Sequence, residues 1–339
     1  MYDQIREAPF YIILYAMVTA MAMMASCYLL FRRGNAIAPD VTSSVRLRRW
    51  TGVFFAFIAL NHVWYMPIFF LSSSEDIMMA DFIGGLLDSL TVFPLAIIAL
   101  FVMLQDRRRP LWPIAVMMAP FVVGKVWCVA NRSYAILPII LGYVLLLGVG
   151  LTIYFVRALR QYGRWLRDNY ADLEHKEVWQ SFAVLGIMLL VFVIYAYTND
   201  GPVYQYAMLI IVFLLIGYLL WRVETLSELI MPVNDAEEEE QGTPHGPSLR
   251  NDIGPLLKKH CEEPQLYLQH DLTLLQLTKA IGINRSYLSK YFFSQGTTYN
   301  AYINGLRIQH FVKLYRESAA NHQPLTAQEM AYQSGFRRL

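Results

Sequence analysis

The sequence predicts an all-α protein in which a seven-transmembrane-helix bundle is followed by a smaller helical domain. Hydrophobic residues make up 56% of the 339 residues and charged residues only 16%, an apolar share well above that of a soluble domain. The apolar residues are concentrated in the first two-thirds of the chain, in runs long enough to cross a bilayer. The last third carries short amphipathic segments with helix-capping signals instead.

Seven apolar runs each have about the length that a transmembrane helix needs. The first is too long for a cleaved signal peptide and has no basic segment before it, so we expect it to stay in the protein as a membrane helix. The seven runs cover residues 9–31, 51–71, 82–104, 111–130, 136–156, 181–197 and 204–221.

The charges of the connecting loops predict the orientation of these helices. The first, third and fifth loops carry thirteen Lys and Arg residues, whereas the amino-terminal tail and the fourth loop carry only Arg6 and Arg132. Basic loops stay in the cytoplasm. We therefore expect the amino terminus outside and, after seven crossings, the carboxyl end inside.

Three ionisable side chains within the apolar runs form a candidate sensor cluster: His62, Asp88 and Lys125. At 1.5 Å per residue, His62 and Asp88 lie at similar depths, roughly 12–14 Å below the outer surface. Polar groups in lipid need partners, so we expect a His62–Asp88 contact with Lys125 nearby. The cluster would sense a small polar ligand or a proton. The alternative is a hydrogen-bonded clamp between helices, with Lys125 extending to the interface.

The fifth loop, residues 157–179, mixes aromatic residues with arginines in an amphipathic pattern. We expect a helix along the inner membrane surface. Contact with the C-terminal domain is the alternative, and the sequence does not decide between them.

An acidic Gly/Pro-rich linker is predicted to join two domains. Residues 224–248 contain seven acidic residues and no Lys or Arg, a composition that cannot form a core. The chain thus divides into a membrane domain (1–223), this linker (224–248) and a C-terminal domain (249–339). The last of these has eleven Lys and Arg against six acidic residues, a net charge of +5.

Residues 273–293 predict two short helices joined by a tight turn. Thr273 and Gln276 form a capping box, Gly282 suits a sharp turn, and Asn284 can cap the second helix. The apolar residues that would share a small core are Leu277, Ile281, Ile283, Leu288 and Tyr291.

The second of these helices is left with a polar, basic outer face. Such a face suits the major groove of DNA, although a helical hairpin with a solvated basic face is the plainer alternative. The residues of the outer face are Arg285, Ser286, Tyr287, Ser289 and Lys290.

A long amphipathic helix ending near Ser318 follows, and then a second capping box, Thr326 with Glu329, and Ser334-Gly335-Phe336. Together, residues 272–336 resemble the AraC/XylS-type DNA-binding domain, in which a linking helix joins two helix-turn-helix units. The resemblance implies base contacts from the outer-face residues of the first unit. Together with the predicted orientation, it implies that the DNA-binding domain lies in the cytoplasm, at a bacterial inner (plasma) membrane.

The chain departs from the pattern of this family at two places. Thr278 stands where the first unit usually has alanine. The sequence also stops at Leu339, where the second recognition helix would begin. Either the regulator is inactivated by truncation, or it works with one complete helix-turn-helix unit.

Nothing in the sequence predicts an enzyme, a cofactor or a metal site. The three cysteines, Cys27, Cys128 and Cys261, are far apart, and the histidines of the C-terminal part have no ligand-like spacing. The cytoplasmic part also has no phosphate-binding glycine loop, no paired metal ligands and no nucleophile with a plausible base.

These observations favour a membrane-embedded one-component transcription regulator that binds promoter DNA under the control of a signal received in the membrane. One complete and one incomplete helix-turn-helix unit would bind DNA weakly, so we expect a homodimer formed through the membrane helices. The alternative is a seven-helix receptor or transporter whose soluble tail binds a protein partner.

Overall fold

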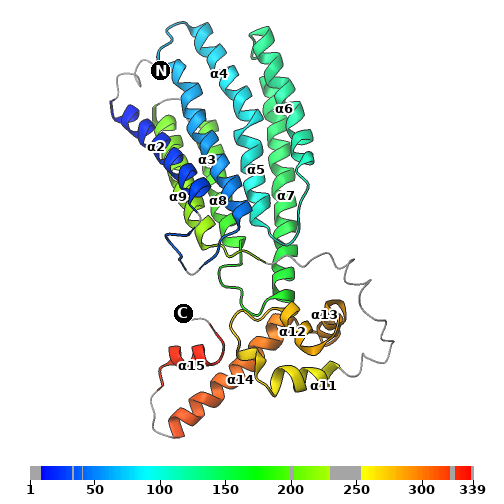
Figure 1. Cartoon of the computed structure of the whole chain (residues 1–339). Helices are drawn as coiled ribbons and strands as arrows, with labels where there is room; N and C mark the ends of the chain where they lie inside the picture. The colour runs from blue at the N-terminus through cyan, green and yellow to red at the C-terminus, as the bar shows by residue number, and fades with distance from the viewer. Residues whose placement is uncertain are drawn as a thin grey trace. The chain divides into compact units, whose positions relative to one another are not determined.

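The computed structural model describes residues 9–32, 34–39, 41–198, 202–229, 253–320 and 325–336, and their regular structure is helical (Figure 1). This confirms the predicted all-helical class for these residues. The chain divides into two compact units. Unit 1 comprises residues 1–159 and 178–229, and unit 2 comprises residues 160–177 and 230–339.

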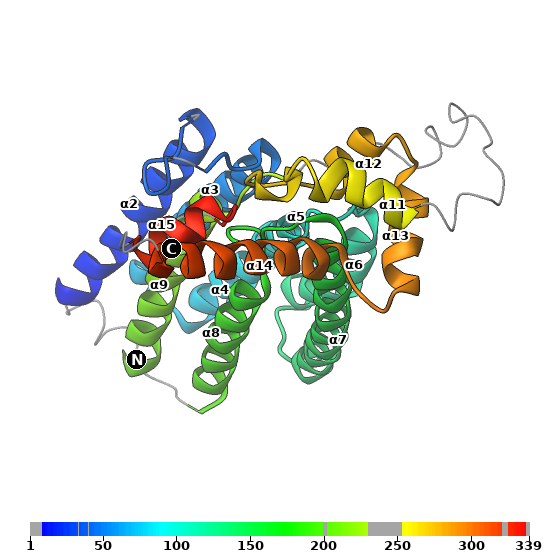
Figure 2. The same ribbon diagram turned by 90° about the horizontal axis from the view of Figure 1, so that it is seen from below.

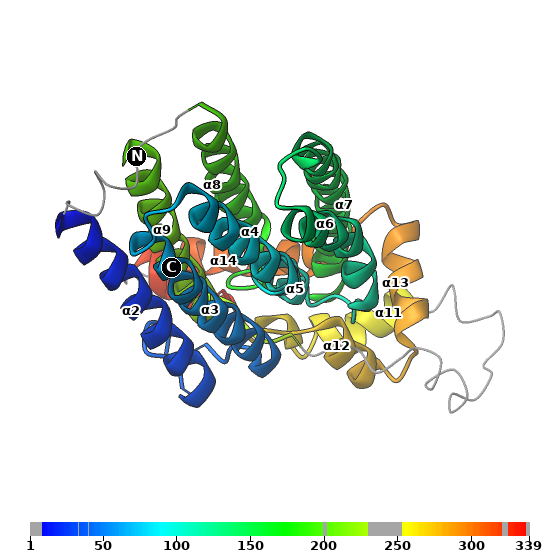
Figure 3. The ribbon, with the colours of Figure 1, turned by 90° about the horizontal axis from the view of Figure 1, so that it is seen from above.

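Unit 1 is a bundle of long helices. Helix α3 packs on α2 and α5, α4 packs on α6, and α9 packs on both α2 and α8 (Figure 3). The elements are α2 (Pro9–Phe31), α3 (Val45–Tyr65), the 3₁₀ turn η1 (Met66–Phe69), α4 (Ser74–Leu90), α5 (Val92–Met103), α6 (Trp112–Asn131), α7 (Leu137–Asn169), α8 (Trp179–Thr198) and α9 (Pro202–Thr225).

Six stretches of the described residues are long and apolar enough to cross a membrane. No more than 39% of the apolar window of any of them is buried, so large apolar side chains face outward. A water-facing surface of this kind would be unstable, whereas lipid accommodates it. The six stretches are Pro9–Phe31, Val45–Phe69, Ser74–Met103, Trp112–Asn131, Leu137–Asn169 and Gln205–Thr225.

Prolines shape two of these stretches. Helix α3 ends at Tyr65 and tightens into η1, where Pro67 has no N–H for the helical ladder. The stretch expected as one helix over residues 82–104 is two helices, broken at Thr91. The ring of Pro94 would collide with the carbonyl of Leu90 in a continuous helix, which explains this break.

Helix α7 is longer than expected, because it continues through the first part of the fifth loop to Asn169. Residues 160–177, which the sequence left either on the membrane surface or on the C-terminal domain, make their described contacts within unit 2. Glu224, expected as the first linker residue, lies inside α9. The rest of the predicted linker beyond Leu229 lies outside the described residues.

Unit 2 is built from short helices around one core. Helix α15 packs back on the long helix α14 (Figure 2). The elements are α11 (Ile253–Leu257), the π-helical turn η3 (Lys258–Glu262), the 3₁₀ turn η4 (Leu266–Leu268), α12 (Leu274–Ile281), α13 (Arg285–Ser294), α14 (Tyr299–Ala320) and α15 (Ala327–Gln333).

Arg307 of α14 connects η4 with the residues that follow α15. Its side chain is 1% exposed, and it donates to the carbonyls of Tyr267 and Gln269, each at 2.8 Å. Its guanidinium also lies over the ring of Phe336, 5.7 Å from the centroid. Phe336 therefore has a packing partner, and Met330 of α15 is buried as well.

Candidate functional site

The α12–α13 pair is fixed by local hydrogen bonds. The Thr273 hydroxyl accepts from the Gln276 N–H at 3.2 Å, and the Gln276 side chain accepts from the Thr273 N–H at 2.8 Å. Gly282 ends α12 with φ of +78°, a left-handed conformation that favours glycine. The Asn284 carboxamide then accepts from the Ser286 N–H at 2.8 Å and starts α13. These bonds set the angle between the two helices.

Helix α13 has a buried face and a polar face, as its sequence predicts. Leu288 and Phe292 are buried in the core of unit 2. On the opposite face, Tyr287 is 53% exposed, and Ser289 and Lys290 are exposed. The remaining members of the predicted DNA-contact set, Arg285 and Ser286, are half-buried.

One strongly exposed aromatic residue of this helix is absent from the predicted set. Phe293 is 87% exposed at the end of α13. Its register places it beside Ser289 and Lys290 rather than beside Leu288. The helical spacing could have revealed this exposure.

Arg285 has a partner that the sequence did not predict. Its Nη2 donates to the Asn169 Oδ1 at 2.5 Å, so the end of α7 meets the first turn of α13 inside unit 2. Asn169 also donates from its Nδ2 to the carbonyl of Trp165 at 2.6 Å, which orients its oxygen toward the guanidinium. The two residues are 116 positions apart, too far for a local pattern to reveal.

The second capping box repeats the geometry of the first. The Thr326 hydroxyl accepts from the Glu329 N–H at 3.2 Å, and the Glu329 carboxylate accepts from the Thr326 N–H at 2.9 Å. Gly335 is left-handed with φ of +85°, nine positions after Thr326, just as Gly282 is nine positions after Thr273. Two segments of unit 2 therefore share one local design of capping box, short helix and glycine turn.

Burial changes the acid–base behaviour of several groups in unit 2. It raises the pKa of the Cys261 thiol to about 12, so this side chain stays protonated at neutral pH and behaves as a small apolar residue. Burial and a hydrogen bond to Glu262 also raise the pKa of Tyr302. These groups lie in the core, away from the polar face of α13.

The predicted sensor residues of unit 1 are arranged differently from the expectation. Asp88 accepts hydrogen bonds from the Asn61 amide at 2.6 Å and from the Tyr65 hydroxyl at 3.0 Å. His62 bonds through Nδ1 to the Ile58 carbonyl of its own helix at 2.8 Å, and its ring lies 4.7 Å from that of Tyr15. The expected His62–Asp88 contact is thus replaced by an Asn61–Asp88 contact.

Two glycines of α4 make room for the partners of Asp88. A Cβ on Gly84 would lie 2.5 Å from the Tyr65 ring, and a Cβ on Gly85 would lie 2.8 Å from the Lys125 Nζ. Gly85 is one helical turn from Asp88, so the Lys125 ammonium lies against the same helix as this carboxylate. His62 faces Tyr15 instead.

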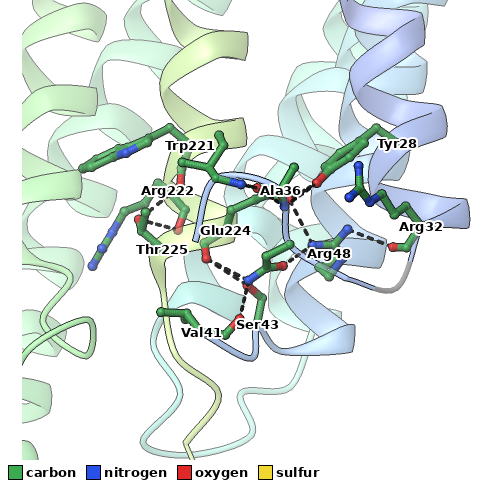
Figure 4. A network of polar contacts seen from close by, with 12 residues as sticks. Tyr28, Arg32, Ala36, Val41, Ser43, Arg48, Trp221, Arg222, Glu224 and Thr225 are labelled. Atoms are coloured by element: carbon green, nitrogen blue, oxygen red, sulfur yellow. Dashed lines mark hydrogen bonds and ion pairs between the residues drawn. The ribbon is translucent and has the colours of Figure 1, made fainter. Parts of the chain in front are cut away.

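A second polar network in unit 1 surrounds Glu224 of α9 (Figure 4). This carboxylate is fully buried, and it accepts from the Tyr28 hydroxyl and from the N–H groups of Ala36, at 3.0 Å, and Ile37, at 2.7 Å. Arg48 lies 3.5 Å away. The sequence suggested a solvated acidic spacer here, yet the residue joins the α2–α3 loop to α9.

Asn35 completes this network. Its amide donates to the backbone carbonyls of Val41 at 2.6 Å and Glu224 at 2.9 Å, and its Oδ1 accepts from Arg48 at 2.7 Å. The network is a satisfied structural junction.

Within the described residues, no group of three or more His, Cys, Asp or Glu side chains is placed to hold a metal ion. Comparison of the chain with protein-family models, with curated proteins and with solved structures finds no match.

Proposed function

We propose that this chain is a membrane-embedded one-component transcription regulator, whose membrane helices receive a signal and whose C-terminal unit binds promoter DNA. The observation that carries the proposal is the α12–α13 pair. Its helices are fixed by a capping box and a left-handed glycine, and its second helix carries a polar, basic face over a packed core. This is the geometry that a helix needs to enter the major groove.

The repeated design of unit 2 supports a DNA-binding domain of the AraC/XylS type. That family has two helix-turn-helix units joined by a linking helix. Here α14 lies between two segments with the same capping box and the same glycine spacing. The net charge of +5 on residues 249–339 would supply attraction to phosphates.

The proposed topology has seven crossings. Helix α8, Trp179–Thr198, has 20 residues without a charged side chain and supplies the seventh crossing beside the six candidate spans. An odd number of crossings, with the basic odd-numbered loops inside, puts unit 2 in the cytoplasm of a bacterial cell, where DNA is available.

The proposed signal is a small polar ligand or a proton at the Asp88 cluster. The support is a carboxylate within a candidate span that accepts from Asn61 and Tyr65 and lies near Lys125. Ionisable groups within membrane spans are costly and commonly serve a function. We further propose that two copies of the chain act together, because the described α12–α13 pair alone offers only one short reading helix.

The test is DNA binding by the full-length protein in lipid nanodiscs, using a labelled fragment of its own upstream region with excess competitor DNA. We expect Arg285→Ala to weaken binding to this fragment about 10- to 100-fold, since a base-contacting arginine contributes about 1–3 kcal/mol. Binding to the competitor should change much less.

Lys313→Ala is the matched control. It also removes one positive charge, from an exposed lysine of α14 that pairs with Glu317 at 3.8 Å. We expect it to weaken binding to both DNAs equally and only slightly. Equal effects of the two variants on both DNAs would refute sequence-specific reading by α13 and favour a tail that binds a protein partner.

A further inference from the structure

The last residue of α7 and the residues that follow it are built into unit 2. We call residues 169–176 the docking segment. Tyr170 pairs with Thr273 in an antiparallel bridge, and the Ala171 N–H donates to the Leu272 carbonyl at 3.3 Å. Ala171 is 2% exposed and belongs to the core cluster of unit 2. The segment is therefore a packed component of this unit.

The docking segment also binds the start of α14. The Asn300 amide donates to the carbonyls of Tyr170 at 3.1 Å and Ala171 at 2.7 Å, and the Asn304 amide donates to the same Ala171 carbonyl at 3.0 Å. Two asparagines one helical turn apart thus hold one short backbone stretch. Such bonds are specific to a defined register of the segment.

An ion pair between a buried lysine and a partly exposed aspartate fixes the other end of the docking segment. Lys176 is 6% exposed, and its Nζ lies 3.1 Å from the Asp271 carboxylate, just before α12. The ammonium also lies over the Tyr170 ring at 5.6 Å, and the Lys176 carbonyl accepts from the Tyr162 hydroxyl at 2.9 Å. A buried ammonium without its partner is costly, so this pair stabilises the packed position of the segment.

Asn169, the first residue of the docking segment, binds Arg285, which is the principal candidate for a base contact. The Asn169 oxygen holds the Nη2 of Arg285 at 2.5 Å. An arginine that reads a guanine presents two N–H groups to the O6 and N7 atoms in a defined plane. The bond to Asn169 fixes the direction of the guanidinium, so we expect that turning both terminal groups toward a base moves Nη2 away from Asn169. DNA and Asn169 therefore compete for one guanidinium.

We propose that the docking segment is an autoinhibitory element that regulates DNA binding, with Asn169 holding Arg285 away from DNA until the segment shifts. This inference rests on the proposed function. In the chain, the segment is joined to α7 on one side and to α8 on the other, so a rearrangement of these two helices pulls directly on it. A signal in the membrane helices then reaches Arg285 through Asn169, the last residue of α7.

The test uses two substitutions of one residue with opposite expected effects. Asn169→Ala removes the acceptor, and we expect the full-length protein in nanodiscs to bind its upstream fragment about tenfold more tightly. Asn169→Asp replaces the amide with a carboxylate that forms a stronger pair with Arg285, and we expect about tenfold weaker binding. Damage to the fold would weaken binding in both variants, so opposite shifts cannot come from misfolding.

Two further measurements make the result decisive. The double variant Asn169→Ala with Arg285→Ala should bind no more tightly than Arg285→Ala alone. All variants carry Cys27→Ser, and slow labelling of the buried Cys261 thiol reports that unit 2 is folded. Specific, Arg285-dependent binding that neither Asn169 variant alters would overturn the autoinhibition and leave the proposed function standing. Absence of specific binding in every variant would overturn both.

Discussion

His310 lies at the contact between α14 and α15. Its Nδ1 lies 3.4 Å from the Ser334 hydroxyl, and its ring lies 6.3 Å from that of Tyr267. Burial and the nearby Lys313 lower the pKa of His310, and Glu317 opposes this shift. The neutral ring is therefore the form that fits the folded unit.

This lowered pKa predicts a loss of stability in mild acid. The unfolded chain takes up a proton near pH 6.5, where the folded protein does not, so the unfolded state binds more protons below that pH. The contribution of neutral His310 is complete above about pH 6.5 and declines as the pH falls toward the folded pKa. We expect the Tm of unit 2, followed by Cys261 labelling, to fall between pH 7.5 and 5.5. His310→Gln should flatten this slope, and an unchanged slope would contradict the assignment.

The sensor cluster shows what sequence reasoning resolves at the scale of single residues. Counting the rise per residue placed the polar groups of α3 and α4 at matching depths. Neighbouring residues on a helix point about 100° apart, however, so depth alone does not say which of Asn61 and His62 faces Asp88. The structure gives that position to Asn61, and His62 turns toward Tyr15. The direction depends on how α3 and α4 pack, which no local pattern encodes.

At the scale of elements, the capping box of α12 is the feature that stabilises the start of the α12–α13 pair. The Thr273 side chain satisfies an N–H group that the first helical turn leaves without a partner. Helix α12 has only eight residues, so one cap is a large part of its stability.

We predict that Thr273→Ala lowers the stability of unit 2 by about 1 kcal/mol, the usual cost of losing an N-cap. Thr273→Ser is the control, because it keeps the hydroxyl and should restore nearly all of the stability. Hydrogen exchange at the amides of the first turn of α12 gives the measurement. Equal exchange in the alanine and serine variants would contradict a role for the hydroxyl.

Elements of unit 2 were more predictable than those of unit 1. Capping boxes and glycine turns act between residues three to nine positions apart, so Thr273, Gly282 and Thr326 carry visible signals. The break at Thr91 and the continuation of α7 to Asn169 carry weaker ones. The length of an apolar run indicates how far the lipid-facing surface extends. The length of a helix depends instead on how far its backbone hydrogen bonds continue.

At the scale of the whole molecule, composition alone predicts the helical class and the apolar spans. It could not predict that residues 160–177 belong with the C-terminal helices. The bonds that fix the docking segment to Arg285, Asn300 and Asn304 join residues 116 to 133 positions apart. The arginine-rich sequence of residues 160–177 is equally typical of a helix on a membrane surface. Only the three-dimensional arrangement distinguishes these two locations.

The Glu224 network leads to a prediction about unit 1 as a whole. Glu224→Gln leaves the buried Arg48 without a compensating charge, and breaking a buried pair costs about 3–5 kcal/mol. The double variant Glu224→Gln with Arg48→Met removes both charges and should recover much of that loss. Thermal unfolding in one detergent gives the comparison. A double variant no more stable than the single one would show that the Arg48 charge contributes little.

The same network sets an order for the synthesis of the protein. Tyr28 and Glu224 are 196 positions apart, so at about 5–20 residues per second the ribosome adds Glu224 roughly 10–40 s after Tyr28. Until then Arg48 and the loop amides of Ala36 and Ile37 have no carboxylate to bind. The α2–α3 loop and α3 therefore lack this hydrogen-bonding partner until α9 has been synthesised, and α9 then completes the network. The segments that contact DNA in our proposal are translated only after that carboxylate.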